Sequence, residues 1–297
     1  MFRHPLSKEE LLAFHASKTQ LTLIEQELEK MLADKFLFEK NGFYTLEAQP
    51  DWVDRRIDAN NRADKMLKGA LRTGRRIGRL PFVQSVSLSG TIAKGVMYKD
   101  SDIDYFVITK ANRTWLAKLS LKLYKLIFHL NSGNGLCYNY LLSEEQLTIN
   151  SQNIYTATEI VTLIPVQIDS VFVEFNKANF WVLDYFPNTN QLCKKLEENE
   201  PIEIKQSSKM SLTAWFERSF EGKIGDKWDR QIMQEIQRGY EKKYDKELME
   251  TGMKSTKNIS KTHPHDMQKK VLNRYEKLLN KHLEQINFKS QSVERDV

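Results

Sequence analysis

Apolar residues recur with two different periods along this chain of 297 residues. Recurrence every three or four positions predicts amphipathic helices, and short apolar or alternating runs predict strands. The predicted helices cover residues 18–34, 50–78, 112–130, 156–163, 228–248 and 271–286. The predicted strands cover residues 82–88, 102–109 and 136–142. Strands interleaved with helices predict an α/β (α+β) fold with a short mixed sheet.

The first 50 residues predict a small unit of their own. Ser7 and Glu10 have the spacing of a capping box, which opens a short helix. Residues 35–46 contain two strand-like runs around Asn41-Gly42, a dipeptide that favours a tight hairpin turn. Helix, helix and hairpin resemble a truncated winged-helix unit. We therefore expect a winged-helix-like segment over residues 1–50, which binds DNA or serves only as a packing module.

The last third of the chain predicts a helical C-terminal region over residues 191–297, after a central core over residues 51–190. An apolar residue recurs every four positions at Trp228, Ile232, Ile236, Tyr240, Tyr244 and Leu248. Such a stripe is typical of a face that packs on the core or on the helix of a partner protein. Residues 251–262 are polar and predict a loop or linker.

Composition excludes several classes of protein. Hydrophobic residues make up 40% of the chain and aromatic residues 10%, too much for a disordered protein. No uncharged apolar run reaches the roughly 18 residues of a membrane span, and no signal peptide is apparent. Two cysteines cannot form a disulfide framework, and Cys137 lies in an apolar run typical of a core. We expect a soluble protein of the reducing cytoplasm, with no membrane partner.

Positive charge is concentrated in one segment. The formal net charge is +6, and residues 51–80 hold nine Lys or Arg against four Asp. A basic segment suits a nucleic acid, a nucleotide triphosphate or an acidic partner, although a solvated helix face is an equal alternative. Arg55, Arg56 and Arg62 of this segment are candidates to line a nucleotide-binding cleft.

A glycine turn links the predicted strand 82–88 to a short helix. The turn is Ser89-Gly90-Thr91, and backbone N–H groups in such a turn point outward and can bind phosphate oxygens. Gly90 allows a phosphate to approach closely, and Thr91 adds a hydroxyl donor. Lys94 can reach a phosphate as a point charge, or it is a solvated lysine.

Two aspartates follow this turn after a spacer of ten residues. Asp102 and Asp104 are two positions apart on the predicted strand, so both carboxylates project from one face. Neighbouring carboxylates repel each other unless a cation lies between them. Mg²⁺ (or Mn²⁺), shared with a triphosphate, is the natural cation for such oxygen ligands. The alternative is an exposed hairpin with two solvated aspartates.

This combination resembles the nucleotidyltransferase superfamily typified by DNA polymerase β. The matching residues are Gly90, Thr91, Asp102, Ile103 and Asp104. The chain is also similar to bacterial and archaeal nucleotidyltransferase-like proteins of unassigned substrate, over roughly residues 36–190. The resemblance implies a nucleotidyltransferase-type core in this part of the chain.

The resemblance also implies an activity. An enzyme of this kind transfers a nucleoside monophosphate from an NTP, with ATP expected, to an acceptor hydroxyl and releases pyrophosphate. Asp102 and Asp104 would hold Mg²⁺. The residues expected to bind the nucleotide are Ser89, Gly90, Thr91 and Lys94. The acceptor could be a small molecule, a protein side chain or the end of a nucleic acid.

Active members of the superfamily usually carry a third carboxylate on the next core strand, where it helps to hold a metal or acts as the base. In this chain Asn139 takes that position, and an amide can ligate a metal but cannot accept a proton. The possible substitutes are Glu144, Glu145, Glu159 and Asp169. Without a third carboxylate, the chain would be a catalytically impaired module that binds a nucleotide or nucleic acid.

Overall fold

A six-stranded mixed sheet forms the centre of the molecule. The computed structural model describes residues 4–128, 136–189, 211–244, 249, 253–262 and 267–293. The strands, in the order β7-β4-β5-β6-β9-β8, are β7 (Ile164–Pro165), β4 (Val83–Ser89), β5 (Ile103–Thr109), β6 (Leu136–Ser143), β9 (Ile259–Thr262) and β8 (Met253–Ser255). The predicted mixed α/β class and the three predicted strands are confirmed.

The connections follow from the direction of the strands. β4 and β5 are antiparallel neighbours and are joined through the short helix α4 (Gly90–Ala93). β5 and β6 are parallel, and α5 (Thr114–Phe128) lies between them in the chain, as a parallel connection requires. The ends of β4 and β5 that adjoin α4 therefore lie beside the start of β6.

The prediction of a loop over residues 251–262 is wrong. β8 and β9 form an antiparallel hairpin in this segment, and β9 pairs with β6. The segment is polar in sequence, but it can form strands in the sheet because its polar side chains have hydrogen-bond partners elsewhere in the fold. Ser260, for example, is buried, and its Oγ accepts a hydrogen bond of 2.6 Å from Lys118 Nζ of α5. The predicted core over residues 51–190 thus shares its sheet with the predicted C-terminal region.

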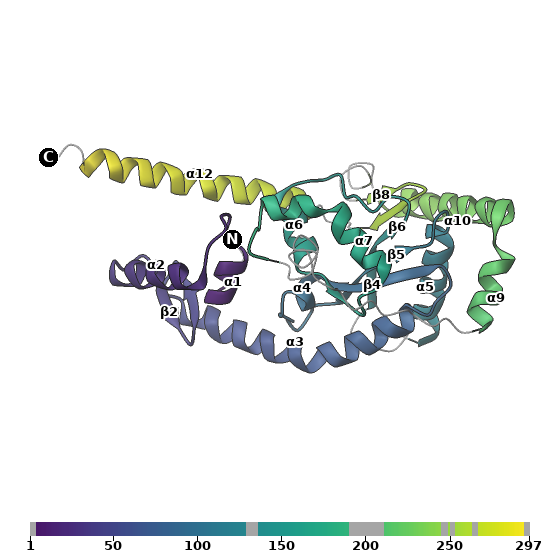
Figure 1. Cartoon of the computed structure of the whole chain (residues 1–297), viewed down its shortest axis with the longest axis horizontal. Coiled ribbons are helices and arrows are strands. Elements are labelled where there is room, and N and C mark those ends of the chain that lie inside the picture. Colours follow the sequence, from purple (N-terminus) through teal and green to yellow (C-terminus); the bar gives the residue numbers. More distant parts are fainter. Residues whose placement is uncertain are drawn as a thin grey trace.

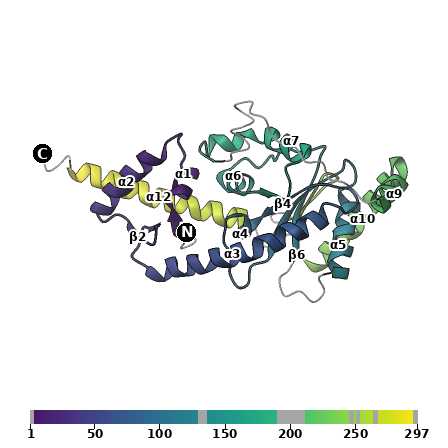
Figure 2. The same ribbon diagram turned by 60° about the horizontal axis from the view of Figure 1, so that its bottom comes forward.

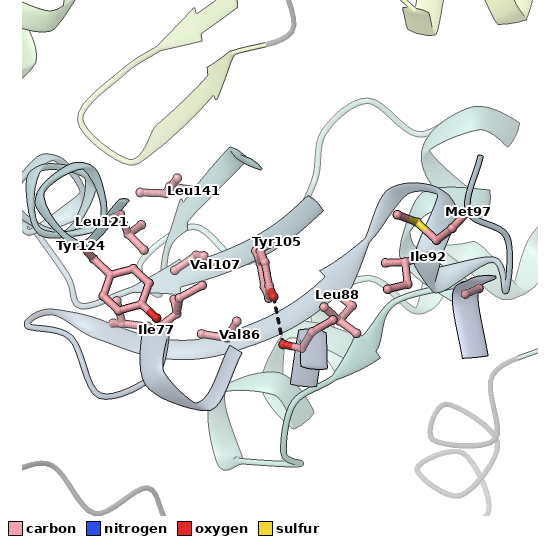
Figure 3. Close-up of a cluster of buried hydrophobic side chains, with 13 residues drawn as sticks. Ile77, Val86, Leu88, Ile92, Met97, Tyr105, Val107, Leu121, Tyr124 and Leu141 are labelled. Carbon is pink, nitrogen blue, oxygen red and sulfur yellow. Dashed lines mark hydrogen bonds between the residues drawn. The ribbon is translucent and has the colours of Figure 1, made fainter. Parts of the chain in front are cut away.

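The first face of the sheet packs against α3 (Pro50–Ile77) and α5 (Figure 1). Figure 3 labels Ile77, Val86, Leu88, Ile92, Met97, Tyr105, Val107, Leu121, Tyr124 and Leu141 in this core. Tyr105 also donates a hydrogen bond of 2.9 Å from its hydroxyl to the Ala70 carbonyl, which ties β5 to α3. The predicted long helix over 50–78 is therefore confirmed, with its apolar side on the sheet.

The second face carries a separate core beneath α6 (Ile154–Val161), α7 (Ser170–Ala178) and the 3₁₀ helix η1 (Phe180–Asp184). Phe106 and Ile108 point to this face, whereas Tyr105 and Val107 point to the first one, as the two-residue period of a strand dictates. Asp104 belongs to the second face by the same alternation. The carboxylate therefore lies on the side of α6.

The N-terminal segment forms a small three-stranded sheet with two helices. Its elements are β1 (Leu6–Ser7), α1 (Lys8–Ala13), α2 (Leu21–Ala33), β2 (Phe38–Lys40) and β3 (Phe43–Thr45), with strand order β1-β3-β2. Ser7 and Glu10 form the predicted capping box. Arg56 of α3 is buried and bonds to Glu10, so this segment is held on α3 by an ion pair.

The C-terminal region adds α9 (Ser211–Ser219), α10 (Gly222–Lys243) and α12 (Met267–Val293). α10 packs against α5, while α12 begins near α6 and extends toward the end of the molecule that holds the N-terminal segment (Figures 1 and 2). The predicted apolar stripe is partly confirmed, because Ile232 packs near Phe82, while Trp228 is half exposed. Leu248, the last residue of the stripe, lies outside the described residues. None of the described helices has the length and apolar character that crossing a membrane needs.

Candidate functional site

The predicted glycine turn lies directly against the second aspartate. Gly90 follows β4 with a φ of +66°, a conformation that favours glycine. A Cβ atom at this position would overlap Asp104 Oδ2 and would lie 3.0 Å from Asp104 Cγ. Strand register explains the approach, since Ser89 is the partner of Asp104 across β4 and β5. The turn and this carboxylate therefore form one surface.

The two aspartates differ in their surroundings. Asp104 is half-buried on β5, whereas Asp102 is exposed and precedes the first residue of that strand, Ile103. The prediction that both lie on the strand is therefore wrong by one residue. The carboxylates still act on each other, because the negative charge of Asp102 contributes to raising the pKa of Asp104.

Asp104 has an unusual protonation equilibrium. The pKa of its carboxyl group is raised to about 6, mainly by burial and in smaller part by the negative charges of Asp102 and Glu159. A hydrogen bond with Cys137 and the charge of Lys94 act in the opposite direction. A carboxylate that burial and like charges make costly to ionise is stabilised by a bound cation.

Lys94 connects the turn to α6. It follows α4, and its Nζ donates hydrogen bonds to the Gly90 carbonyl at 3.1 Å and to Glu159 Oε1 at 3.0 Å. Its side chain is only about one-quarter exposed. The ammonium group is therefore held beside the glycine turn and is not a freely solvated lysine.

The structure distinguishes among the four candidates for a third carboxylate that were named from the sequence. Glu144 accepts from the Ala111 backbone N–H, and Glu145 accepts from the Asn112 side chain, both just past the far ends of β5 and β6. Asp169 caps α7 by accepting from Phe172. Of the four, Glu159 on α6 is the one that influences Asp104.

On the neighbouring strand, the residue opposite Asp104 is Cys137 and not Asn139. The register between β5 and β6 shifts just after this pair, which the sequence does not reveal. Cys137 is half-buried, and its side chain forms a hydrogen bond with Asp104. The prediction of a buried core residue is therefore wrong. The Asn139 side chain, predicted as a metal ligand, lies outside the described side chains.

A large cavity of about 1440 Å³ opens at the turn. The predicted site residues that line it are Ser89, Gly90, Thr91, Lys94 and Asp104. Arg55 lines it as well, whereas Arg56 is buried against Glu10 and Arg62 lies near Asp58. The polar segment 146–158 forms another wall, which the sequence did not indicate, because its side chains meet the turn only through folding of α6 onto the sheet.

The donor set suits a hard divalent cation. Asp102 and Asp104 would supply carboxylate oxygens, the ligands that Mg²⁺ and Mn²⁺ prefer, and Asp104 lies against the Gly90 turn. In the part of the chain that the structure describes, no group of three or more His, Cys, Asp or Glu side chains is arranged to hold a metal ion. A metal held by these two carboxylates would therefore need further oxygen ligands from water or from a bound ligand.

Comparisons with models of protein families, with curated proteins and with solved structures gave no match.

Proposed function

We propose that this protein is a nucleotidyltransferase that transfers a nucleoside monophosphate from an NTP, with ATP expected, to an acceptor hydroxyl. The observation that carries the proposal is the contact between the Gly90 turn and Asp104. A phosphate-binding turn and a metal-binding carboxylate must share one ligand in such a reaction, and here they share one surface. The setting within a large cavity also supports the proposal.

Each group in the site has a role in this proposal. Backbone N–H groups of the turn and Lys94 bind the triphosphate. Asp102 and Asp104 hold Mg²⁺, which neutralises charge on the phosphate oxygens when it is bound. Glu159, which accepts a hydrogen bond from Lys94, is the proposed base, a role that Asn139 cannot fill because an amide does not take up a proton.

The bond changes balance without a further reactant. The acceptor oxygen bonds to the α-phosphorus, and the bond from the α-phosphorus to its bridging oxygen breaks. Pyrophosphate leaves with that electron pair, and Glu159 takes the hydroxyl proton. The phosphates compete with Glu159 for Lys94, so nucleotide binding weakens the ion pair and frees Glu159 for this step.

The proposal is tested by pyrophosphate release from ATP and Mg²⁺ across a panel of acceptors. Asp104→Asn is expected to lower the rate more than about 100-fold, because the metal loses a charged ligand. Asp100→Asn removes an equivalent charge from an exposed position four residues away and is expected to retain the wild-type rate. Glu159→Gln is expected to bind ATP normally, measured by calorimetry, and to lose turnover.

Wild-type protein that binds ATP tightly but releases no pyrophosphate with any acceptor would contradict the enzyme and support a nucleotide-binding module. Equal rates for Asp104→Asn and Asp100→Asn would show that any turnover arises elsewhere.

A further inference from the structure

The second half of α3 presents only positive charge to the solvent. This helix runs along the lower edge of the molecule in Figure 1 and comes to the front in Figure 2. Between positions 65 and 76, every exposed residue of α3 is a lysine or an arginine. These residues form the basic stripe: Lys65, Lys68, Arg72, Arg75 and Arg76. At 3.6 residues per turn they fall within an arc of about 100°, so they share one face of the helix.

The first half of the same helix differs in charge and in partners. Its exposed residues between positions 51 and 64 include four aspartates. Asp54 lies 2.8 Å from Lys40 Nζ, and Asp58 lies 3.8 Å from an Arg62 nitrogen. By contrast, no residue of the basic stripe forms an ion pair with any residue that the structure describes. The positive charge of α3 is therefore concentrated on its second half.

Roles within the chain do not account for the basic stripe. None of its residues lines the large cavity, so the stripe is not placed to bind the nucleotide of the proposed function. The helix dipole favours cations in the last turn of a helix, which holds only Arg75 and Arg76. Lys68, Arg72 and Arg76 follow one another at intervals of four positions, and like charges at this spacing destabilise a helix. An anionic partner from outside the chain would remove this repulsion.

The dimensions of the basic stripe match the backbone of a nucleic-acid duplex. Lys65 and Arg76 are 11 positions apart, which corresponds to about 16 Å along the helix axis. One strand of a DNA duplex carries a phosphate about every 3.4 Å of its axis, so the stripe is as long as about five base pairs. Its charges thus have nearly the density of the phosphates on one strand. Three of its five residues are arginines, whose guanidinium groups bind phosphate oxygens through paired hydrogen bonds.

Other anionic partners fit this surface less well. A helix that binds a membrane surface presents an apolar face to the lipid, whereas the apolar side of α3 is buried against the sheet. Protein interfaces have an apolar centre, and proteins that bind single-stranded nucleic acid stack the bases on aromatic side chains. The exposed positions of the stripe hold no apolar or aromatic residue. The surface is therefore suited to contacts with a regular phosphate backbone.

We propose that the basic stripe binds the sugar–phosphate backbone of double-stranded nucleic acid without reading its sequence. Contacts from lysine and arginine to phosphates supply affinity but carry no information about the bases. Such contacts release counterions from the duplex, so binding weakens steeply as the salt concentration rises. The inference does not depend on the proposed function, because the stripe lies outside the large cavity and its binding needs neither NTP nor metal.

Fluorescence anisotropy with short labelled duplexes tests the inference in the full-length protein, with EDTA present and without ATP. The probes are two DNA duplexes of unrelated sequence, an RNA duplex, and one of the DNA strands alone. The two DNA duplexes are expected to bind with equal affinity, and the RNA duplex shows whether the sugar matters. The logarithm of the binding constant is expected to fall against the logarithm of the salt concentration with a slope of about −4 to −5, since each of five cations displaces about 0.9 counterions.

A triple variant of the stripe locates the binding surface. It combines Lys65→Gln, Lys68→Gln and Arg72→Gln. Binding of a DNA duplex is expected to weaken at least about tenfold, and the slope is expected to become shallower by about 2–3, because three phosphate contacts are lost. A second variant with Lys65→Arg, Lys68→Arg and Arg72→Lys keeps the three charges and is expected to bind as the wild type does. Circular dichroism checks that both chains are folded.

The matched control changes exposed residues of α10 that have the same types and a similar spacing. It combines Lys223→Gln, Lys227→Gln and Arg230→Gln. This variant has the same net charge as the triple glutamine variant of the stripe, and it is expected to keep the affinity and the slope of the wild type. Any difference between the two variants therefore reports the position of the charges and not their number.

The absence of duplex binding at low salt, or equal affinity of the two triple glutamine variants, would overturn the inference. Tighter binding of the single strand, or of phosphatidylserine vesicles measured by co-sedimentation, would assign the stripe to a different partner and overturn it as well. A preference of more than about tenfold between the two DNA sequences would contradict binding through the backbone alone. Duplex binding without pyrophosphate release would remove only the proposed function, and pyrophosphate release without duplex binding would remove only the present inference.

Discussion

At the scale of single residues, Gly90 determines how closely a ligand and a carboxylate approach each other. The residue has a positive φ, and the space that a side chain would need is occupied by Asp104. Gly95 has a similar φ of +68°, but no atom lies within 4 Å of the position of its missing Cβ. Substitutions at the two glycines therefore distinguish the effect of backbone strain from the effect of a side chain that fills the space beside Asp104.

Gly90→Ala is expected to abolish ATP binding, because the new methyl group displaces the Asp104 carboxylate. Gly95→Ala is expected to retain binding. Gly95→Ala is expected to lose about 1–2 kcal/mol of unfolding free energy, since alanine is strained at this φ, and Gly90→Ala is expected to lose more because of the overlap with Asp104. Urea denaturation measures the stability, and calorimetry with ATP and Mg²⁺ measures the binding. Equal ATP affinity in both variants would contradict the role assigned to this contact.

Single residues also show which contacts of the candidate site could be predicted from the sequence. The spacing of Gly90, Asp102 and Asp104 predicted that the turn and the aspartates share one site. The structure brings Asp104 to Gly90 because β4 and β5 are antiparallel neighbours. The sequence did not select Glu159, since α6 meets Asp104 only through packing on the second face of the sheet. Nor did it predict the Cys137 contact, because a register shift between strands leaves no mark in the residue pattern.

At the scale of elements, a residue of α10 caps the N-terminus of α5, which has no capping side chain from its own segment. Asp229 of α10 is buried, and its Oδ1 accepts hydrogen bonds from the Trp115 and Leu116 backbone N–H groups at 2.9 and 2.8 Å. These are N–H groups of the first turn of α5, which have no partner within the helix. A carboxylate at this position also interacts favourably with the helix dipole.

Asp229→Ala is expected to lower the unfolding free energy by about 2 kcal/mol or more, because two buried N–H groups lose their acceptor. Asp229→Asn keeps an acceptor oxygen and is expected to cost less. Urea denaturation of both variants beside the wild type measures the difference. Equal losses in the two variants would indicate a packing role for the side chain instead.

The same residue predicts a pH dependence of stability. Burial raises the pKa of Asp229 to about 6 in the folded protein, above the ordinary value of 3.8. The folded state then binds more protons than the unfolded state between these values, so this group stabilises the fold at low pH and loses its contribution as the pH rises through about 6. The wild type is expected to lose stability relative to Asp229→Asn between pH 4 and pH 7.

At the scale of the whole molecule, the sheet joins parts of the chain that the sequence assigned to different regions. Helix spacing, the capping box and the hairpin around Asn41-Gly42 were predictable, because each depends on residues close together in the chain. The β8–β9 hairpin was not, because its residues become a strand pair only when β6 offers a partner. The predicted boundary at residue 190 therefore falls between strands of one sheet.

A chain that ends at residue 190 is expected to aggregate, because it lacks β9 and α10 and exposes the edge of β6. A chain that ends at residue 262 keeps these elements and loses α12, so it is expected to remain a folded monomer. Size-exclusion chromatography with light scattering distinguishes the two. A monomeric, cooperatively folded chain of 190 residues would show that the core does not depend on the late strands.

The pairing of β6 with β9 also affects how the protein is made. Ile259 follows its partner Leu142 by 117 positions, which corresponds to roughly ten seconds of synthesis at about 5–20 residues per second. Throughout this interval the nascent chain carries β6 with one unsatisfied edge. Chaperone binding on the ribosome is thus most needed after β6 has emerged and before the hairpin arrives to close the sheet.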